Sequence, residues 1–167
     1  MKGILTMDKL LKPELFKITS FFKGDSIDPI LITNQDDKNI DDLIAYILEK
    51  VEIKRYDQKK NRETSKNINK PLTVNQLRKF YDSFLKIYNN TSDEKEKKVQ
   101  LIMLKANAEY SAKRLETKRF NIFFSNRINL VVAKQGEEFK KNLNAFKLHL
   151  EALVAYYPKN IKDKDDE

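Results

Sequence analysis

The feature that most restricts the fold of this chain is a long segment without proline. Between Leu72 and Tyr157 there is no proline, and the only glycine is Gly136. Proline and glycine are the residues that most disfavour the interior of a helix. A segment so poor in both is typical of a succession of helices that is interrupted at few places.

The spacing of apolar residues predicts where the first two helices lie. A stripe at helical spacing predicts a helix over residues 40–55, with Asn39 as its N-cap. A second helix is predicted over residues 73–88, because Thr73 and Gln76 form the T-x-x-Q pattern of a capping box. The first stripe consists of Ile40, Leu43, Ile44, Ile47 and Val51.

The rest of the proline-free segment continues the helical pattern. Residues 93–132 hold two apolar stripes that change phase near residues 116–120, which indicates two helices or one kinked helix. A last helix is predicted over residues 137–157, where apolar residues alternate steps of four and three before Pro158 ends the helix. The predicted fold class is therefore all-α, a compact bundle of about five helices.

Three segments do not follow the helical pattern. Residues 1–38 have no clear apolar period, and we expect a poorly defined N-terminal arm that precedes a helical bundle domain over residues 39–158. Inside that domain, residues 54–70 hold seven basic and two acidic residues, so they carry +5 of the net charge of +8. We predict a mobile basic loop there, and a charged tail over residues 159–167.

The totals favour some partners and exclude some chemistry. Lys and Arg outnumber Asp and Glu by 33 to 25, an excess that favours nucleic acid or another anionic partner but that an AT-rich genome also produces. The absence of cysteine excludes disulfides, thiolate zinc sites and cysteine nucleophiles. The chain has no apolar run long enough to span a membrane, and its start does not resemble a signal peptide. We expect a cytoplasmic protein with no membrane partner.

The sequence offers no catalytic constellation. The single histidine, His149, is flanked by two leucines, which favours a structural role. There is no glycine-rich phosphate loop and no HExxH motif, and the acidic pairs lack the pattern of a calcium loop. We therefore predict no enzyme, no metal and no cofactor. A pair of carboxylates dispersed along the chain is the remaining enzymatic alternative.

Basic residues on the predicted helices form the candidate binding site. Arg119 and Arg127 stand among phenylalanines without an acid nearby in the sequence, where a guanidinium can contact phosphate or stack on a base. The alternative is a set of solvated helix faces with pairs such as Arg78–Asp82. No base-reading pattern is present, so we expect sequence-independent contacts. The candidate nucleic-acid-binding residues are Lys59, Lys60, Arg62, Arg78, Lys79, Lys105, Arg114, Arg119 and Arg127.

Three segments, in this order, resemble the signatures of one family. They are LTVNQLRKFYD at 72–82, LIMLKANAEYSAKR at 101–114 and FKLHLEALVAYY at 146–157. They look like the L-T-x-x-Q-[IL]-R-[KN], L-K-x-x-x-x-Y-x-x-x-R and F-E-A-[IL]-V-A-Y patterns of the small α-helical subunit of the type III-A CRISPR–Cas effector, the Csm complex. The chain departs from these patterns at Leu150, where the family often has Phe, and at Lys113, where it often has Gly. The resemblance does not cover residues 1–38.

The resemblance implies a non-catalytic subunit of an RNA-guided antiviral ribonucleoprotein. Its partners would be guide RNA, target RNA, the backbone and large subunits, and other copies of itself in a filament that forms the RNA groove. Arg78 and Arg114 match arginines of the signatures, so they would face RNA or hold the groove in shape. The rival hypothesis is a helical adaptor that binds an acidic protein through the seam of the last helix, from Phe139 to Tyr157.

Overall fold

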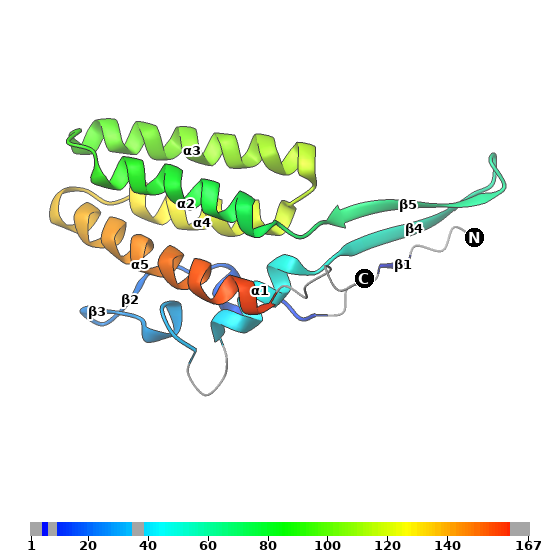
Figure 1. The fold of residues 1–167 in the computed structure, drawn as a ribbon, viewed down its shortest axis with the longest axis horizontal. Helices are drawn as coiled ribbons and strands as arrows, with labels where there is room; N and C mark the ends of the chain where they lie inside the picture. The colour runs from blue at the N-terminus through cyan, green and yellow to red at the C-terminus, as the bar shows by residue number, and fades with distance from the viewer. Residues whose placement is uncertain (1–4, 7–9, 35–38, 161–167) are drawn as a thin grey trace.

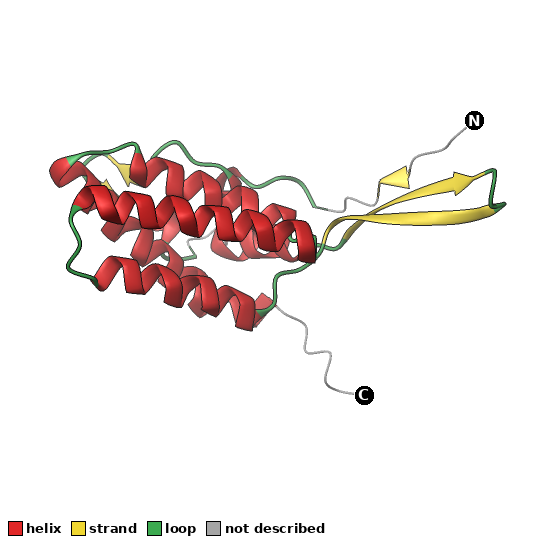
Figure 2. Cartoon of the chain, turned by 90° about the horizontal axis from the view of Figure 1, so that it is seen from above, coloured by secondary structure: helices red, strands yellow, loops and turns green. Residues whose placement is uncertain are grey.

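A computed structural model describes residues 5–6, 10–34 and 39–160, with side chains described for residues 10–34 and 39–157. A helical bundle forms one end of the molecule, and a narrow sheet projects from the other end (Figure 1, Figure 2). The helices are α1 (Asn39–Leu48), α2 (Val74–Asn89), α3 (Glu94–Leu115), α4 (Lys118–Val132) and α5 (Gly136–Asn160). The predicted all-α bundle of five helices is confirmed, and the segment 93–132 forms two helices.

Local signals explain where most of these helices begin and end. Thr73 caps α2, and the reciprocal hydrogen bonds with Gln76 form the predicted capping box. Asp93 caps α3 by accepting a hydrogen bond from the backbone N–H of Glu96 at 2.8 Å. The last helix, α5, continues through Pro158 to Asn160. The prediction that Pro158 ends the helix was wrong by two residues, and helix ends are commonly irregular over such a distance.

The first helix differs from its prediction at both ends. Asn39 lies inside α1, and the side chain of Asn34 accepts hydrogen bonds from the N–H groups of Ile40 and Asp41 in its place. At the other end α1 stops at Leu48, and Val51 is buried as the first residue of a strand. Val51 fits both the helical stripe and the start of the strand, so its spacing could not decide between them.

Residues 54–70 are not a mobile loop, contrary to the prediction. They belong to an antiparallel hairpin of β4 (Val51–Asp57) and β5 (Arg62–Asn69), with a register shift between Val51 and Glu52. The short strand β1 (Leu5–Thr6) pairs with the other edge of β4, which gives the sheet order β1-β4-β5. We call residues 51–69 the arm. It extends away from the bundle in both views (Figure 1, Figure 2).

Residues 10–34 pack on the bundle. They form two 3₁₀ turns, η1 (Glu14–Phe16) and η2 (Pro29–Leu31), and a short hairpin of β2 (Phe22–Lys23) and β3 (Ser26–Ile27). Their buried apolar side chains join the core cluster of the helices; these are Leu15, Phe16, Phe21 and Leu31. The N-terminal segment, which was expected to be poorly defined, is thus ordered over residues 10–34 and contributes to the core.

The core is rich in aromatic residues and is organised around α5. Phe146 of α5 lies within 4.9 to 5.9 Å, centroid to centroid, of Phe21, Phe84 and Phe124. The seam predicted for the last helix faces inward, and all six of its residues are buried: Phe139, Leu143, Phe146, Leu150, Leu153 and Tyr157. In the described part of the chain, no helix is long and apolar enough to cross a membrane.

Candidate nucleic-acid interface

Three of the candidate cations are exposed where the arm leaves the bundle. Arg78 and Lys79 lie on α2 just after its capped start, and Arg114 lies in the last turn of α3. Because α2 and α3 run in opposite directions, the start of one and the end of the other lie at the same end of the bundle (Figure 1). None of the three has an ion-pair partner among the described residues, so the alternative pair Arg78–Asp82 is not formed.

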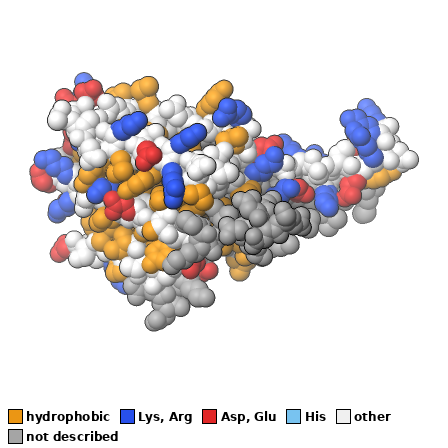
Figure 3. Space-filling model, in the orientation of Figure 1, with side chains coloured by type: hydrophobic (Ala, Val, Ile, Leu, Met, Phe, Trp, Pro, Cys, Tyr) orange, Lys and Arg blue, Asp and Glu red, His pale blue; other side chains and the backbone are white. Residues whose placement is uncertain are grey.

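Three further candidates lie at the tip of the arm. Lys59 and Lys60 belong to the turn, and Arg62 is the first residue of β5; all three are exposed. In the space-filling view, basic side chains gather at this far end of the molecule (Figure 3). The turn is held by Asp57, whose carboxylate accepts hydrogen bonds from the N–H groups of Lys59 at 2.9 Å and Lys60 at 3.3 Å.

Lys105 has a hydrogen-bond partner on a neighbouring helix. It is half-buried on α3, and its ammonium donates to the side-chain oxygen of Asn129 on α4 at 2.8 Å. It therefore fastens α3 to α4. Further along α3, Tyr110 is 70% exposed.

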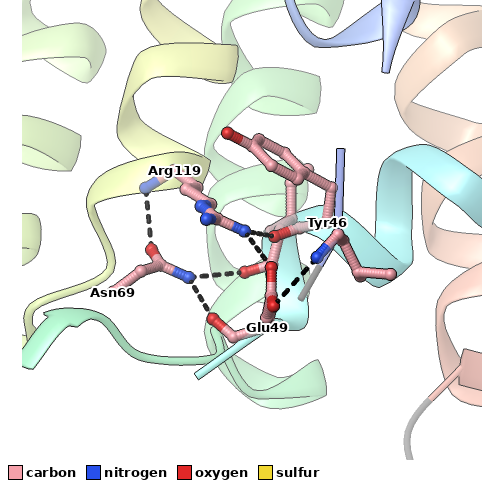
Figure 4. Close-up of polar contacts among 6 residues, drawn as sticks. Tyr46, Glu49, Asn69 and Arg119 are labelled. Carbon is pink, nitrogen blue, oxygen red and sulfur yellow. Dashed lines mark hydrogen bonds and ion pairs between the residues drawn. The ribbon is translucent and has the colours of Figure 1, made fainter. Parts of the chain in front are cut away.

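Arg119 lies inside the protein, contrary to the expectation of a surface cation. It is 8% exposed, and its Nη1 donates to Glu49 Oε2 at 2.7 Å and to the carbonyl oxygen of Tyr46 at 2.9 Å (Figure 4). The guanidinium carbon also lies 3.8 Å from the centroid of the Tyr46 ring. The acid that Arg119 seemed to lack is Glu49, which is distant in sequence and adjacent in space.

Asn69 completes this network and joins the arm to the bundle. Its side-chain N–H groups donate to the carbonyl oxygens of Ile47 at 3.1 Å and Glu49 at 2.7 Å, and its Oδ1 accepts from the backbone N–H of Arg119 at 2.9 Å (Figure 4). Helix ends leave such carbonyl and N–H groups without partners inside the helix. Asn69 and Arg119 together therefore satisfy the end of α1, and Asn69 also satisfies the start of α4.

Arg127 is the most deeply buried cation in the part of the chain that the structure describes, which contradicts its expected contact with nucleic acid. It is 0% exposed, and its guanidinium lies 4.3 Å from the centroid of the Phe123 ring. Its Nη1 donates to the carbonyl oxygen of Phe16 at 2.9 Å, and its Nη2 donates to that of Leu15. Burial lowers the pKa of Arg127 to about 9, because the charged form loses its hydration. The residue pins the N-terminal segment to α4.

His149 has the structural role that the sequence predicted. It is 1% exposed, and its Nε2 accepts a hydrogen bond from Arg127 Nε at 3.3 Å. The ring proton therefore lies on Nδ1, which is 2.7 Å from the carbonyl oxygen of Leu31 and donates to it. Burial and the nearby charge of Arg127 lower the pKa of His149 to about 3, so the ring is neutral.

The acidic residues form no cluster that suggests catalysis in the part of the chain described. Asp28 accepts a hydrogen bond from the N–H of Ile30 at 3.2 Å and so caps η2. Among the residues described, no group of three His, Cys, Asp or Glu side chains lies close enough to hold a metal ion. Residues 161–167 of the predicted tail lie outside the described residues.

Sequence reasoning missed the arm and its anchor. The alternation of Val51 and Ile53, followed by the turn-forming residues between Asp57 and Asn61, is a hairpin signal that could have been read. Asn69 had no such signal, because its partners lie 20 to 50 residues away in the sequence.

Comparison with known proteins gives one match. The family model described as Csm2 Type III-A matches residues 50–162. No curated protein and no solved structure matches the chain significantly. The matched range includes the arm and the helices α2 to α5.

Proposed function

This chain belongs to the Csm2 type III-A family, and on that premise we propose that it lines the groove that holds guide and target RNA. The family is that of the small subunit of the type III-A Csm effector, a non-catalytic structural subunit of a CRISPR complex. Members are therefore partners of the other Csm subunits. The finer proposal is that basic side chains of this chain contact the RNA backbone without reading its bases.

The observation that carries the proposal is the set of exposed cations at one end of the bundle. Arg78, Lys79 and Arg114 lie there without ion-pair partners among the described residues, whereas several lysines elsewhere on the bundle are paired with acids. Unpaired cations attract phosphate by releasing its counterions, which gives affinity without sequence preference. Arg119 and Arg127 are not part of the proposed surface, because both are buried.

The first test is purification of the tagged protein from its native cell, with and without ribonuclease. We expect short RNAs that share a repeat-derived 5′ end, together with several co-purifying subunits. A protein partner without any bound RNA would refute the RNA role.

The second test reverses charge at the proposed surface. We expect the double variant R78E and R114E to weaken binding of an unstructured RNA and to flatten its salt dependence, because each lost phosphate contact lowers the slope by about 0.7. The matched control is the double variant K95E and K134E, which reverses two exposed lysines at the opposite end of the bundle that form no ion pair among the described residues. Equal binding by both variants, with unchanged helical content, would show that the surface is wrongly assigned.

A second candidate function, binding of a protein partner, is favoured by the outer face of α3. The seam of α5 is core and cannot serve as the partner groove that the adaptor hypothesis placed there. On α3, however, apolar residues line the side opposite the core at helical spacing and are 50% to 70% exposed: Val99, Ile102, Met103 and Tyr110. A helix with apolar residues on both sides suits burial between two neighbours. A partner that survives ribonuclease in the first test would support this function.

A further inference from the structure

The arm is a projecting element whose strands are held without a hydrophobic core of their own. Its paired part, from Val51 to Asp57, spans about 20 Å at the usual rise of a strand. Beyond Val51 and Asn69 at its base, the arm has no buried residue. A ribbon of two long strands, with only the two-residue β1 on one edge, buries too little apolar surface to be explained by stability alone.

The pairing register sorts the charges of the arm onto one face. Residues that face each other across a ladder share a side of the sheet, and so do residues two apart in one strand. The pairs Ile53–Lys66, Arg55–Thr64 and Asp57–Arg62 therefore lie on one face. The pairs Lys54–Ser65 and Tyr56–Glu63 lie on the other. The first face thus carries three cations, and the tip adds Lys59 and Lys60 at its end.

These five cations are available to a ligand. Arg55, Lys59, Lys60, Arg62 and Lys66 are all exposed, and none forms an ion pair within the described part of the chain. The one acid on the same face, Asp57, is engaged with the backbone N–H groups of the turn.

The base of the arm is fixed to the bundle. Asn69, the last residue of β5, is fully buried and hydrogen-bonds to the end of α1 and the start of α4 (Figure 4). An ion pair between Lys70 and Glu116 at 3.3 Å lies next to this anchor. The arm is therefore directed outward from the same end of the bundle that exposes Arg78 and Arg114.

We propose that the basic face of the arm, formed by Arg55, Arg62 and Lys66 with Lys59 and Lys60 at the tip, is a second binding surface that lies along a sugar-phosphate backbone. The ligand class is a polynucleotide, and its identification as RNA rests on the proposed function. The face lacks the exposed apolar centre of a protein interface, since its large apolar residues Ile53 and Ile68 lie toward the base and are half-buried. A row of unpaired cations on a narrow ribbon suits a repeating phosphate instead.

The test measures binding of fluorescent RNA to the full chain by anisotropy, across a salt series that starts at 50 mM. One variant replaces the five cations with glutamine (R55Q, K59Q, K60Q, R62Q and K66Q). The matched control makes five such changes outside the arm, at exposed lysines that form no ion pair among the described residues (K17Q, K23Q, K86Q, K95Q and K134Q). A 20-nucleotide single strand and a 20-base-pair RNA duplex are compared, because either could supply the backbone. Circular dichroism checks that the helical content of both variants equals that of the wild type.

We expect the arm variant to lose at least tenfold in affinity at 50 mM salt, and the control to change less than threefold. The slope of log Kd against log salt should fall by about 0.7 for each lost contact with a single strand. A larger loss for one of the two RNAs would identify the form of backbone that the arm contacts. An arm variant that binds both RNAs as the control does would overturn the inference, as would a wild-type chain that binds neither RNA at 100 µM.

This inference and the proposed function fail separately. If the arm variant binds free RNA as well as the control does, while R78E with R114E weakens binding, the bundle surface stands and the arm surface falls. If the purification from native cells yields a protein partner and no RNA, the RNA role falls. An acidic protein that binds the wild type and not the arm variant would overturn the phosphate assignment.

Discussion

Arg127 and His149 show how a charged residue can be held in the core without an acid. The guanidinium charge is offset by two backbone carbonyl oxygens, those of Leu15 and Phe16, and by the face of Phe123. His149 accepts from Arg127 and donates to Leu31, so the ring must stay neutral for both bonds to exist. A second positive charge beside Arg127 would be repelled in a medium of low dielectric constant.

The neutral His149 predicts a specific loss of stability in mild acid. Its pKa is lowered to about 3 in the folded state, against about 6.5 in the unfolded state. Between these values the unfolded chain binds the extra proton, so protonation favours unfolding as the pH falls. We expect the free energy of unfolding to drop by about 2 kcal/mol from pH 7 to pH 5 on account of this residue. Urea unfolding at pH 7 and at pH 5 measures this difference in the free energy of unfolding.

The comparison variant for this measurement is H149Q, which removes the titrating group. Its stability should change less between pH 7 and pH 5 than that of the wild type, whatever its absolute stability. Parallel pH profiles for the two proteins would mean that His149 takes up protons in the folded state.

At the scale of single residues, the sequence separated exposed from buried cations only in part. Arg78 and Arg114 were expected on helix surfaces and lie there. Arg119 and Arg127 looked similar, because the sequence near them holds phenylalanines and no acid. Their partners are Glu49 and the carbonyl oxygens of residues 15 and 16, which lie 70 and about 110 residues away in the sequence. A pattern among neighbouring residues in the sequence cannot predict such distant contacts.

Among the elements, α2 is the one whose start depends most clearly on local sequence. Thr73 accepts from the N–H of Gln76 at 3.2 Å, and Gln76 Oε1 accepts from the N–H of Thr73 at 3.0 Å. These reciprocal bonds satisfy two backbone donors that would otherwise have no partner in the protein. They also set the start of the helix that presents Arg78 and Lys79.

Removal of this cap should weaken the whole bundle measurably. We expect T73A to lower the free energy of unfolding by about 1 kcal/mol, the usual cost of losing a hydroxyl cap. T73S keeps the hydroxyl and should lie close to the wild type. Chemical denaturation of the three proteins tests this, and equal losses in both variants would show that the methyl group of Thr73, and not the cap, matters.

Helices were easier to predict than the arm for a physical reason. A helix is stabilised by bonds and contacts three or four residues apart, so caps and stripes appear directly in the sequence. The arm depends on pairing between residues up to 18 apart, such as Val51 with Asn69, and its polar strands lack a buried face that would give a strong alternation. Its high charge resembled that of a mobile loop.

For the whole molecule, the five-helix bundle followed from the sequence, and the role of residues 10–34 did not. Their apolar residues have no single period, because they fill separate gaps between helices that are formed elsewhere in the chain. Phe16 packs edge-on against Tyr46 at 4.9 Å, and Phe21 stacks on Phe146 at 5.9 Å. The first contact is with α1 and the second with α5, so the segment bridges two helices.

This bridging predicts that residues 10–34 unfold together with the helices. Phe21 is 0% exposed, and its truncation in F21A removes a large aromatic side chain from the core. We expect a loss of about 3–5 kcal/mol in the free energy of unfolding, within a single transition. The matched control is L11A, because Leu11 belongs to the same segment and is 94% exposed. That variant should stay within about 0.5 kcal/mol of the wild type.

The two readouts that decide this are far-UV circular dichroism, which reports the helices, and the intrinsic fluorescence of the seven tyrosines, to which Tyr46 beside Phe16 contributes. If the segment is part of the cooperative unit, F21A shifts both denaturation curves together. If F21A left the helical transition unchanged, the segment would be an independent attachment, and residues 39–158 would fold as the separate domain that the sequence suggested. Because Arg127 and His149 both depend on carbonyl oxygens of this segment, we expect the cooperative outcome.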